Sequence, residues 1–366
     1  MTELPGMERR KRILILGVNI LSGRRTGGML YTAKVYEYLA KQSDFQVEYV
    51  ELSQLGAWSR SRLMSLYLML RHGKRYDCLV IDASIYYFLY LLYGKMRGAK
   101  IVCVYHHFIS KERRSVRKAV SAIRERMLVN IVDKSIFVSN STLNDAFELG
   151  FHGNDFILVK PGLDKETWPD RTKEYAVSGG KFDVLYVGHV AERKGVLDLV
   201  LGFGRFLHGV TDMEGKGHIR LNIVGNDRAD PVFTSELRQS IQSHGLSEHV
   251  DITGWLNHDE AVEYYRRADV FVHPSHYEGY GIVAMEAASF GLPLIVSDAG
   301  ALPEVVQEGK YGFIFRVGDR DSLGEKLMVL YRDHALRLSM SENSAMLYGD
   351  SFTWDEVGRR VVEYLG

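Results

Sequence analysis

The sequence predicts an α/β fold made of two doubly wound, Rossmann-like domains that face a cleft. Short runs rich in β-branched residues alternate with longer helical patterns, which is typical of a parallel sheet with helices on both faces. The alternation ends near residue 165 and starts again near residue 180, and 366 residues suffice for two separate cores. We therefore expect a first domain at residues 1–165 and a second at residues 178–350.

A basic N-terminal tail leads into the first predicted strand, RILILGVN. A charged start and an apolar run are also typical of a signal peptide, but this run contains Asn19 and no small-residue cleavage site follows it, so a strand is the better interpretation. A helix is expected from about Met29 to Lys41. The later elements of this domain are the strands QVEYVEL, CLVIDA and KIVCVYH, a basic helix and the strand KSIFVS.

The stretch KETWPDRTKEYAVSGGK is the predicted interdomain connection, because it has proline, paired glycines and many charges with little periodicity. The second domain then begins with the strand KFDVLYVGHV. Its further predicted elements are a helix near 197–207, the strand HIRLNIVGN, a helix near 234–244, the strand HVDITGWL, the helix HDEAVEYYRRA, the strand DVFVHPS, the helix after EGYG and the strand PLIVSD. Ligands bind at the carboxyl ends of strands in such sheets, so the glycines that follow strands are the places to search for a site.

Charge and composition narrow the function classes. The chain has no net charge, but residues 1–177 hold 28 basic and 18 acidic side chains and the remainder holds the reverse, so only the first half suits an anionic partner. Cys78 and Cys103 offer neither a disulfide framework nor metal-ligand spacing, which indicates a reducing compartment. The most apolar other run, Ile85–Tyr93, is shorter than the roughly 20 residues that span a bilayer, and no membrane-crossing segment is expected.

The stretch EGYGIVAMEA contains the first candidate site. Gly279 and Gly281 stand just before the pattern turns helical, so bare backbone N–H groups and a helix N-terminus can approach an anion such as phosphate. Glu278 lies in the loop, and Glu286 lies about one turn into an otherwise apolar helix, where it needs a hydroxyl or another hydrogen-bond donor. Alternatively, one of the two glutamates is solvated and the other is a helix cap.

A second candidate is VGHVAERKGV, which also follows a strand. It places Arg193 and Lys194 beside a glycine and ahead of a helix. Two cations at a helix start run against the preference of the helix dipole for acids, so the negative charge of a ligand is the expected compensation. The alternative is a solvated basic turn.

Two further candidates lie in the first domain. Gly27 and Gly28 open its first helix and can approach a phosphate or a substrate, although the motif is neither GxGxxG nor a P-loop. His106 and His107 end the strand KIVCVY, and one of them is a candidate general base or hydrogen-bond partner of a substrate. The alternative is an ordinary strand-end histidine.

The DRD at Asp319–Asp321 mimics a metal-binding Asp-x-Asp motif. It stands just before a helical run, so helix capping is the better explanation, and no metal is expected.

The motifs, taken in order, resemble the retaining glycosyltransferases of family 4, which have the GT-B fold. They are the Gly-Gly loop, the strand-end histidine, VGHVAERKG, DITGWL and ADVFVHPSHYEGYGIVAMEAASFGLPLIVSDAGALPEVV. The resemblance covers nearly the whole chain and is most specific from Val250 to Gly312, where Glu278 and Glu286 match the family's E-x7-E pair.

The resemblance implies a role for each candidate residue. Arg193 and Lys194 would hold the diphosphate of a nucleotide sugar, Glu278 would contact the transferred hexose, and Glu286 would contact the ribose. One of the two histidines would face the reaction centre from the first domain. The implied donor-binding positions are Gly27, Gly28, Gly188, Gly279, Tyr280, Gly281, Ile282, Val283 and Glu286.

The resemblance also implies the reaction. A hexose-type sugar would move from a UDP or GDP donor to a glycan or lipid-linked acceptor with retention of anomeric configuration, and no metal or other cofactor would be required. The final stretch SFTWDEVGRRVVEYLG, residues 352–366, resembles the family's closing helix that packs back on the first domain. Trp354 would anchor it there or would be a plain core contact.

A basic helix at 111–126 suggests a membrane surface. Val116, Val120, Ile123 and Met127 share one helical face, which is expected to be core. The other positions are largely cationic, which suits anionic lipid or an anionic acceptor. The aromatic-rich segments 57–75 and 85–95 are candidates to extend this surface or to pack on the sheet. No nucleic-acid-binding module is recognised, and nucleic acid is not an expected partner.

The sequence therefore predicts a cytoplasmic glycosyltransferase, peripheral on the inner face of the membrane, that acts in the synthesis of cell-surface polysaccharide or glycolipid. A sugar-nucleotide epimerase or hydrolase of the same fold is one alternative, and a non-catalytic nucleotide-sugar-binding protein is another.

Overall fold

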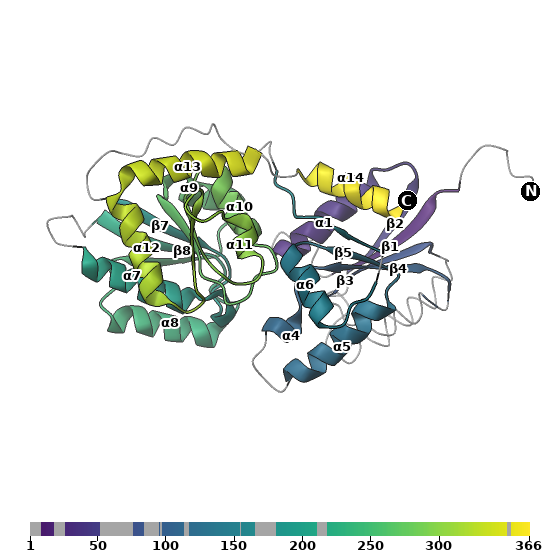
Figure 1. Cartoon of the computed structure of the whole chain (residues 1–366), viewed down its shortest axis with the longest axis horizontal. Helices are drawn as coiled ribbons and strands as arrows, with labels where there is room; N and C mark the ends of the chain where they lie inside the picture. The colour runs from purple at the N-terminus through teal and green to yellow at the C-terminus, as the bar shows by residue number, and fades with distance from the viewer. Residues whose placement is uncertain are drawn as a thin grey trace, which may run out of the picture. The chain divides into compact units, whose positions relative to one another are not determined.

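The computed structural model describes residues 9–17, 26–51, 76–83, 95, 97–112, 117–153, 155–164, 181–210, 218–349 and 353–366. The chain divides into two compact units (Figure 1). The first unit comprises Met1–Gly162 with Phe352–Gly366, and the second comprises Leu163–Ser351. The predicted connection at 165–180 and the aromatic-rich segment at 57–75 lie outside the described residues, as does nearly all of the segment at 85–95.

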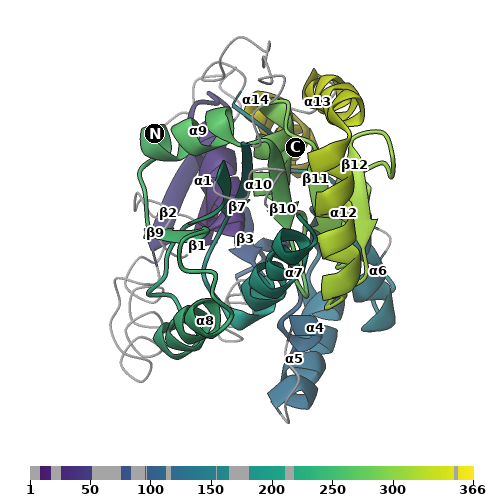
Figure 2. The ribbon, with the colours of Figure 1, turned by 90° about the vertical axis from the view of Figure 1, so that its left-hand side faces the viewer.

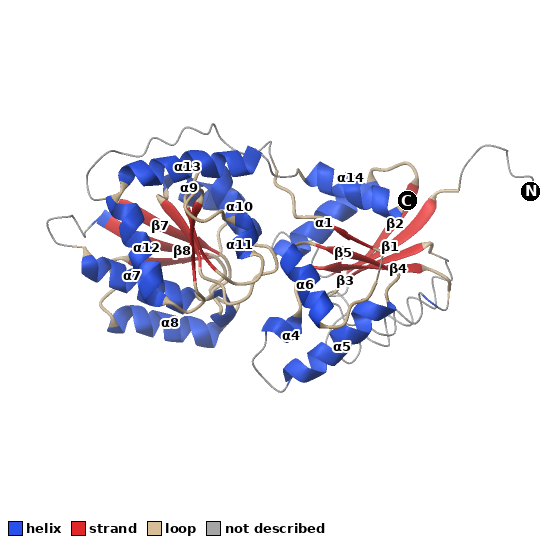
Figure 3. Cartoon of the chain, viewed as in Figure 1, coloured by secondary structure: helices blue, strands red, loops and turns tan. Residues whose placement is uncertain are grey.

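The first unit contains a parallel six-stranded sheet in the order β2-β1-β3-β4-β5-β6. Most of its strands are largely apolar because helices cover both faces of a parallel sheet (Figure 3), and the edge strand β2, with Gln46 and Glu48, is the exception. The strands are β1 (Lys11–Gly17), β2 (Phe45–Glu51), β3 (Cys78–Asp82), β4 (Lys100–Tyr105), β5 (Lys134–Phe137) and β6 (Phe156–Leu158). The described helices are α1 (Gly27–Ala40), α4 (Ile109–Glu112), α5 (Arg117–Ile131), α6 (Asn140–Glu148) and α14 (Trp354–Leu365).

The C-terminal helix α14 belongs to the first unit and lies along α1 (Figure 1). Trp354 is buried, and its ring meets that of Tyr31 edge to face at 6.0 Å. The two helices pack so closely that a Cβ on Gly358 would stand 2.2 Å from Cγ of Tyr38. Lys11 donates through Nζ to the carbonyl of Leu365 at 2.6 Å, which satisfies a backbone group at the end of α14.

The predicted basic helix at 111–126 is two described helices, α4 and α5, and its apolar face is not core. Val120, Ile123 and Met127 are 49%, 62% and 53% exposed, so the expectation that this face is buried was wrong. The buried side of α5 is formed instead by Glu125, Leu128 and Val129. Glu125 accepts hydrogen bonds from the backbone N–H groups of residues 109 and 110, at the start of α4. Residues 113–116 lie outside the described part of the chain.

The second unit has the same architecture, with the parallel strand order β12-β11-β10-β7-β8-β9. Its strands are β7 (Phe182–Val187), β8 (Ile219–Val224), β9 (Val250–Gly254), β10 (Val270–His273), β11 (Leu294–Ser297) and β12 (Gly312–Phe315). Its helices are the 3₁₀ turn Glu192–Lys194, α7 (Val196–Gly209), α8 (Pro231–Ser243), α9 (His258–Arg267), α10 (Ile282–Ser289), α11 (Leu302–Val305), α12 (Arg320–Arg332) and α13 (His334–Gly349). The predicted α/β fold with two Rossmann-like sheets is confirmed.

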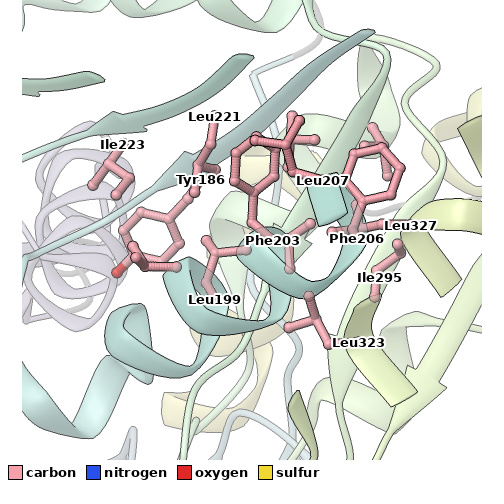
Figure 4. Close-up of a cluster of buried hydrophobic side chains, with 14 of the residues drawn as sticks. Tyr186, Leu199, Phe203, Phe206, Leu207, Leu221, Ile223, Ile295, Leu323 and Leu327 are labelled. Atoms are coloured by element: carbon pink, nitrogen blue, oxygen red, sulfur yellow. The ribbon is translucent and has the colours of Figure 1, made fainter. Parts of the chain in front are cut away.

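The main core of the second unit lies between its sheet and the paired helices α7 and α12 (Figure 2). Phe203 and Phe206 of α7 pack against Leu221 of β8, and Leu323 closes the cluster from α12 (Figure 4). Asp319 accepts a hydrogen bond from the backbone N–H of residue 322 at the start of α12. This contact confirms that the DRD motif caps a helix.

Candidate functional site

The loop after β7 carries the two predicted phosphate-binding cations. Arg193 and Lys194 form the end of the short 3₁₀ turn, and Gly195 follows with φ of 66°. A Cβ on Gly195 would stand only 1.9 Å from the carbonyl oxygen of Pro274, so glycine is required both by the backbone conformation and by the close approach. His276 donates its backbone N–H to the carbonyl of Arg193 at 2.8 Å. The loop after β7 is thereby fixed to the loop after β10.

The loop after β10 brings Glu278 to Lys194. Nζ of Lys194 lies 2.5 Å from Oε2 of Glu278, and the two side chains are only 13% and 16% exposed. The same carboxylate oxygen lies 3.0 Å from Nε2 of His273 and accepts from Oγ of Ser275 at 3.3 Å. Oε1 of Glu278 makes no hydrogen bond or ion pair with any described residue.

The surroundings of Glu278 favour the ionised form of its carboxyl group. Burial would raise the pKa of Glu278, but Lys194 and the hydrogen bond from His273 outweigh it and hold that pKa well below its usual range. Burial, with Lys194 and Arg193 adding to it, lowers the pKa of His189, so this neighbouring imidazole stays neutral. Burial also lowers the pKa of His273 despite the opposing effect of Glu278. His273 is therefore a neutral donor to a charged carboxylate.

Glu286 has the hydrogen-bond donor that the sequence analysis required. The hydroxyl of Tyr265, on α9, donates to Oε2 of Glu286 at 3.1 Å. Burial raises the pKa of Glu286, and the hydrogen bond from Tyr265 opposes that effect. A half-buried carboxyl group with one fixed donor remains able to accept from a ligand hydroxyl.

The N-terminus of α10 is open to a ligand. Gly281 precedes the helix with φ of 92°, and no side chain caps the helix at this end. The backbone N–H groups of Ile282 and Val283 begin the helix and have no intrahelical partner. The side chain of Tyr280 is buried, so Gly279 and Tyr280 contribute backbone to this turn. These amides match the anion-binding arrangement that the glycines predicted.

A second polar cluster, centred on Asp198, contacts the loop after β10. Asp198, in the first turn of α7, accepts from Nε2 of His276 at 2.6 Å and from Nε of Arg320 at 2.7 Å. Burial would raise the pKa of Asp198, but these two partners lower it. Asp198 thus connects α7, the loop after β10 and α12.

In the first unit, the structure separates the two candidate histidines. His106 is 8% exposed, and its Nε2 lies 3.3 Å from Oδ2 of Asp82 and 3.3 Å from Oγ1 of Thr32. A Cβ on Gly28 would stand 3.1 Å from the ring of His106, so the first helix and this histidine meet directly. His107 turns instead toward Glu112, at 3.9 Å.

The remaining predicted positions fall beside these clusters. Gly27 is the first residue of α1, next to Gly28, and Gly188 follows β7 and donates its N–H to the carbonyl of Val224 at 2.9 Å. Sequence reasoning missed Asp82, His273 and the partners of Asp198. The position of His273 at a strand end before Pro and Ser was a usable signal. The partners of Asp198 are distant in the sequence and gave none.

The fold and the sequence both place this chain in a known class of proteins. Two Rossmann-like units, with glycine loops at the carboxyl ends of their strands, define the GT-B class of fold. The family model described as glycosyl transferases group 1 matches residues 169–346, and the model described as glycosyltransferase family 4 matches residues 32–167. The chain belongs to glycosyltransferase family 4.

Curated relatives are distant and longer. The chain is 25% identical over 211 residues to mannosylfructose-phosphate synthase of Agrobacterium fabrum, a match that covers 56% of this chain and 46% of that protein. It is 28% identical over 237 residues to glycogen synthase of Mycobacterium tuberculosis, covering 64% and 54%. The chain spans about half the length of the curated relatives it matches.

Solved structures agree with the fold over nearly the whole chain. Sucrose-phosphate synthase of Thermosynechococcus elongatus superposes with a TM-score of 0.78 at 19% identity, covering 97% of this chain and 98% of that one. HepE of Anabaena, solved in complex with UDP and glucose, gives 0.77 at 17% identity, covering 97% and 99%. Among the described residues, no helix is both long and apolar enough to span a bilayer.

Proposed function

We propose that this protein is a retaining, metal-independent glycosyltransferase that moves a hexose-type sugar from a UDP or GDP donor to a glycan or lipid-linked acceptor. The observation that carries the proposal is the buried Lys194–Glu278 pair beside the uncapped N-terminus of α10. A cation and open amides suit a diphosphate, and a carboxylate suits sugar hydroxyls. Membership of the family and the UDP-bound structural neighbour support the same donor class.

Each polar group of the second unit has a role in this proposal. Arg193 and Lys194 bind the donor diphosphate, together with the amides of Ile282 and Val283. Glu278 presents Oε1, which has no partner among the described residues, to a hydroxyl of the hexose, and Glu286 accepts from the ribose. In the first unit, His106 is the histidine proposed to act on substrate, with Asp82 and Thr32 both in contact with its Nε2. His107 has no place in the proposed chemistry.

The proposed reaction is balanced without a protein nucleophile. The bond between the anomeric carbon and the diphosphate oxygen breaks, and the acceptor oxygen bonds to that carbon from the same face. The acceptor proton passes to an oxygen of the departing diphosphate. Arg193 and Lys194 stabilise the charge that grows on this leaving group, a type of contribution whose removal costs about 10² to 10³ in rate.

Calorimetric titration with UDP and GDP, in the presence of Mg²⁺ and again in EDTA, tests the donor site. We expect one nucleotide to bind equally well in both conditions and to bind more weakly to Lys194→Ala. Binding of neither nucleotide, or binding that requires Mg²⁺, would contradict the proposal. Product analysis with and without acceptor distinguishes the alternatives, because an epimerase or hydrolase alters the donor when no acceptor is present.

We also propose that α5 rests on an anionic membrane surface, which would place the enzyme peripherally on the cytoplasmic face, where cell-surface polysaccharide or glycolipid is assembled. The exposed stripe of Val120, Ile123 and Met127 lies between Arg124 on one side and Arg126 on the other. An apolar stripe bordered by cations suits the boundary between head groups and acyl chains. This exposure is the observation that favours lipid over simple solubility.

Vesicle sedimentation tests the membrane proposal. The full chain should bind vesicles that contain phosphatidylglycerol and should not bind vesicles of phosphatidylcholine alone. Ile123→Gln with Met127→Gln should reduce binding, whereas Val232→Gln on α8, where the valine is 70% exposed, should leave it unchanged. Equal binding by all three proteins would remove α5 from the interaction.

A further inference from the structure

A polar hollow of about 380 Å³ lies at the amino ends of β7, β8 and β9 in the second unit. The loops that hold Lys194 and Glu278 follow the carboxyl ends of β7 and β10, so the hollow is at the opposite end of the same sheet. Its volume is within the range of about 300 to 1,000 Å³ that is usual for ligand sites. Nothing in the proposed transfer reaction uses it.

The register of the three strands brings polar side chains together at the hollow. Arg220 on β8 is paired with Asp183 on β7, and Asn222 is paired with Asp251 on β9. Residues two apart on a strand share a face, so Arg220 and Asn222 point away from the main core, which takes the intervening residue and its neighbours. Three adjacent strands therefore contribute polar groups to one face of the sheet.

Asn222 is the most informative member of this group. It is 7% exposed and lines the hollow, yet its side-chain amide makes no hydrogen bond with any described residue. The amide atoms of Asn222 are not among the fully buried polar atoms that lack a partner, so they face the open hollow, where water or a ligand reaches them. Within the described part of the chain, Arg220, Glu248 and Asp251 likewise make no ion pair. Arg220, Glu248 and Asp251 are exposed to solvent, so a molecule that enters the hollow would replace water on these polar groups.

The mixture of hydrogen-bond donors and acceptors that lines the hollow indicates which kind of molecule would bind there. Arg220 and Arg267 are donors, Glu248 and Asp251 are acceptors when ionised, and the Asn222 amide is both. A phosphate would be attracted by the guanidinium groups but repelled by the carboxylates beside them. The described residues also contain no cluster of three acidic, histidine or cysteine side chains placed to hold a metal ion. Sugar hydroxyls donate and accept at once and carry no charge, so a neutral glycan matches both kinds of group.

We propose that this hollow is an accessory binding site for a neutral glycan chain, separate from the donor loops. The choice of a glycan rests on the proposed function, because the acceptor or product of the transfer would be its source. A second glycan contact on the same unit would keep a growing chain associated with the enzyme between transfers, since linked contacts raise the effective concentration of the chain.

The test uses neutral tetrasaccharides of glucose, mannose and galactose with the full chain, in saturation-transfer NMR with excess UDP present. UDP occupies the donor loops, so the signal reports other sites. We expect at least one tetrasaccharide to bind, and Asn222→Leu and the more exposed Arg220→Gln each to weaken that binding at least tenfold. Asn343→Leu, a matched change elsewhere in the second unit, should leave it unchanged. UDP affinity should be the same in all four proteins.

Three results would overturn the inference. Wild-type protein could bind UDP but no tetrasaccharide, which leaves the hollow to water. Tetrasaccharide binding could survive both Asn222→Leu and Arg220→Gln, which places it elsewhere. Inorganic phosphate or glycine could bind in a manner that Asn222→Leu abolishes, which assigns the hollow to a different ligand class. Failure of UDP to bind would instead count against the proposed transferase, and the tetrasaccharide result would still be interpretable.

Discussion

Glu278 is held through one carboxylate oxygen and leaves the other available. Lys194, His273 and Ser275 all contact Oε2, while Oε1 has no partner among the described residues. Three donors on one oxygen restrict rotation of the carboxylate, so the direction of Oε1 is set before any ligand arrives. At the scale of single residues, the candidate site is thus pre-organised by the three side chains that hold Glu278.

Replacing Lys194 by alanine removes the cation proposed to stabilise the leaving diphosphate. We expect a loss of about 10² to 10³ in the rate of sugar transfer, because one donor to developing charge is lost. Lys310→Ala, at an exposed lysine of the same unit, is the control and should retain the wild-type rate. An unchanged rate in Lys194→Ala, measured with saturating donor and acceptor, would remove Lys194 from the chemistry.

Replacing His273 tests whether it positions Glu278. His273→Leu removes a hydrogen bond to a charged group, worth about 1.5 to 3 kcal/mol, so we expect kcat to fall roughly ten- to a hundredfold while affinity for UDP stays the same. His273→Gln keeps an N–H donor and should recover part of the rate. The readouts are steady-state kinetics and UDP titration; a loss of UDP affinity in step with kcat would indicate a general structural defect.

The residues that sequence reasoning found have a local signal in the sequence, whereas those that it missed depend on contacts between different strands. Glu278 and Glu286 stand out because a carboxylate in an apolar segment requires an explanation within that segment. Asp82 lies at the end of β3 and meets His106, which directly follows β4, and such pairing depends on which strands are neighbours. Strand order is set by the packing of the whole sheet, so the partner of His106 was not predictable, and neither was the different surrounding of His107.

At the scale of elements, α5 shows how periodicity can mislead. Val120, Ile123 and Met127 recur at helical spacing, which was interpreted as a core face. The spacing is the same whether such a face packs on a sheet or meets solvent or lipid, and only the fold distinguishes them. The core side of α5 instead includes Glu125, whose burial is compensated by two backbone N–H groups of α4.

The contacts of Asp198 with His276 and Arg320 predict a pH-dependent contribution to the stability of the second unit. Because its partners depress the folded-state pKa of Asp198, the stabilisation is present above the ordinary aspartate value of about 3.9 and is lost as pH falls through the lower folded value. We expect Asp198→Asn to lower the free energy of unfolding of the second unit by about 1 to 3 kcal/mol at pH 7.

Denaturant titrations of wild type and Asp198→Asn from pH 7 to pH 3 provide the measurement. The difference in unfolding free energy should hold down to about pH 4 and shrink below it. Asp321→Asn, at an exposed aspartate of α12, serves as the control and should show little difference at any pH. A difference that grows toward acid would reverse the sign of the argument.

At the scale of the whole molecule, the chain is two cores that repeat one plan. The sequence pattern predicted this because most of the parallel strands are rich in apolar residues and each crossover needs a helix. The spatial order of the strands, β2-β1-β3-β4-β5-β6 and β12-β11-β10-β7-β8-β9, was not predictable from the pattern. Alternation fixes which elements exist, whereas neighbour relations depend on contacts between elements far apart in the chain.

The assignment of α14 to the first unit predicts separate effects on the two units. Trp354→Ala should destabilise the first unit by about 3 to 5 kcal/mol, because it leaves a cavity beside α1. UDP at 100 times its dissociation constant should stabilise only the unit that binds it, by about 2.7 kcal/mol. In calorimetric scans, Trp354→Ala should therefore lower one transition and leave the UDP-sensitive transition in place. A shift of the UDP-sensitive transition by Trp354→Ala would contradict this division.

The position of α14 also has a consequence for how the chain is made. The helix α1 leaves the ribosome early, but the helix that covers it is translated after the whole second unit. At about 5 to 20 residues per second, the intervening unit takes on the order of ten to forty seconds to synthesise. During that interval the surface around Tyr31 and Tyr38 is exposed on the nascent chain, so the first unit to be started is the last to be finished. Chaperones that bind nascent apolar surface would find their target there.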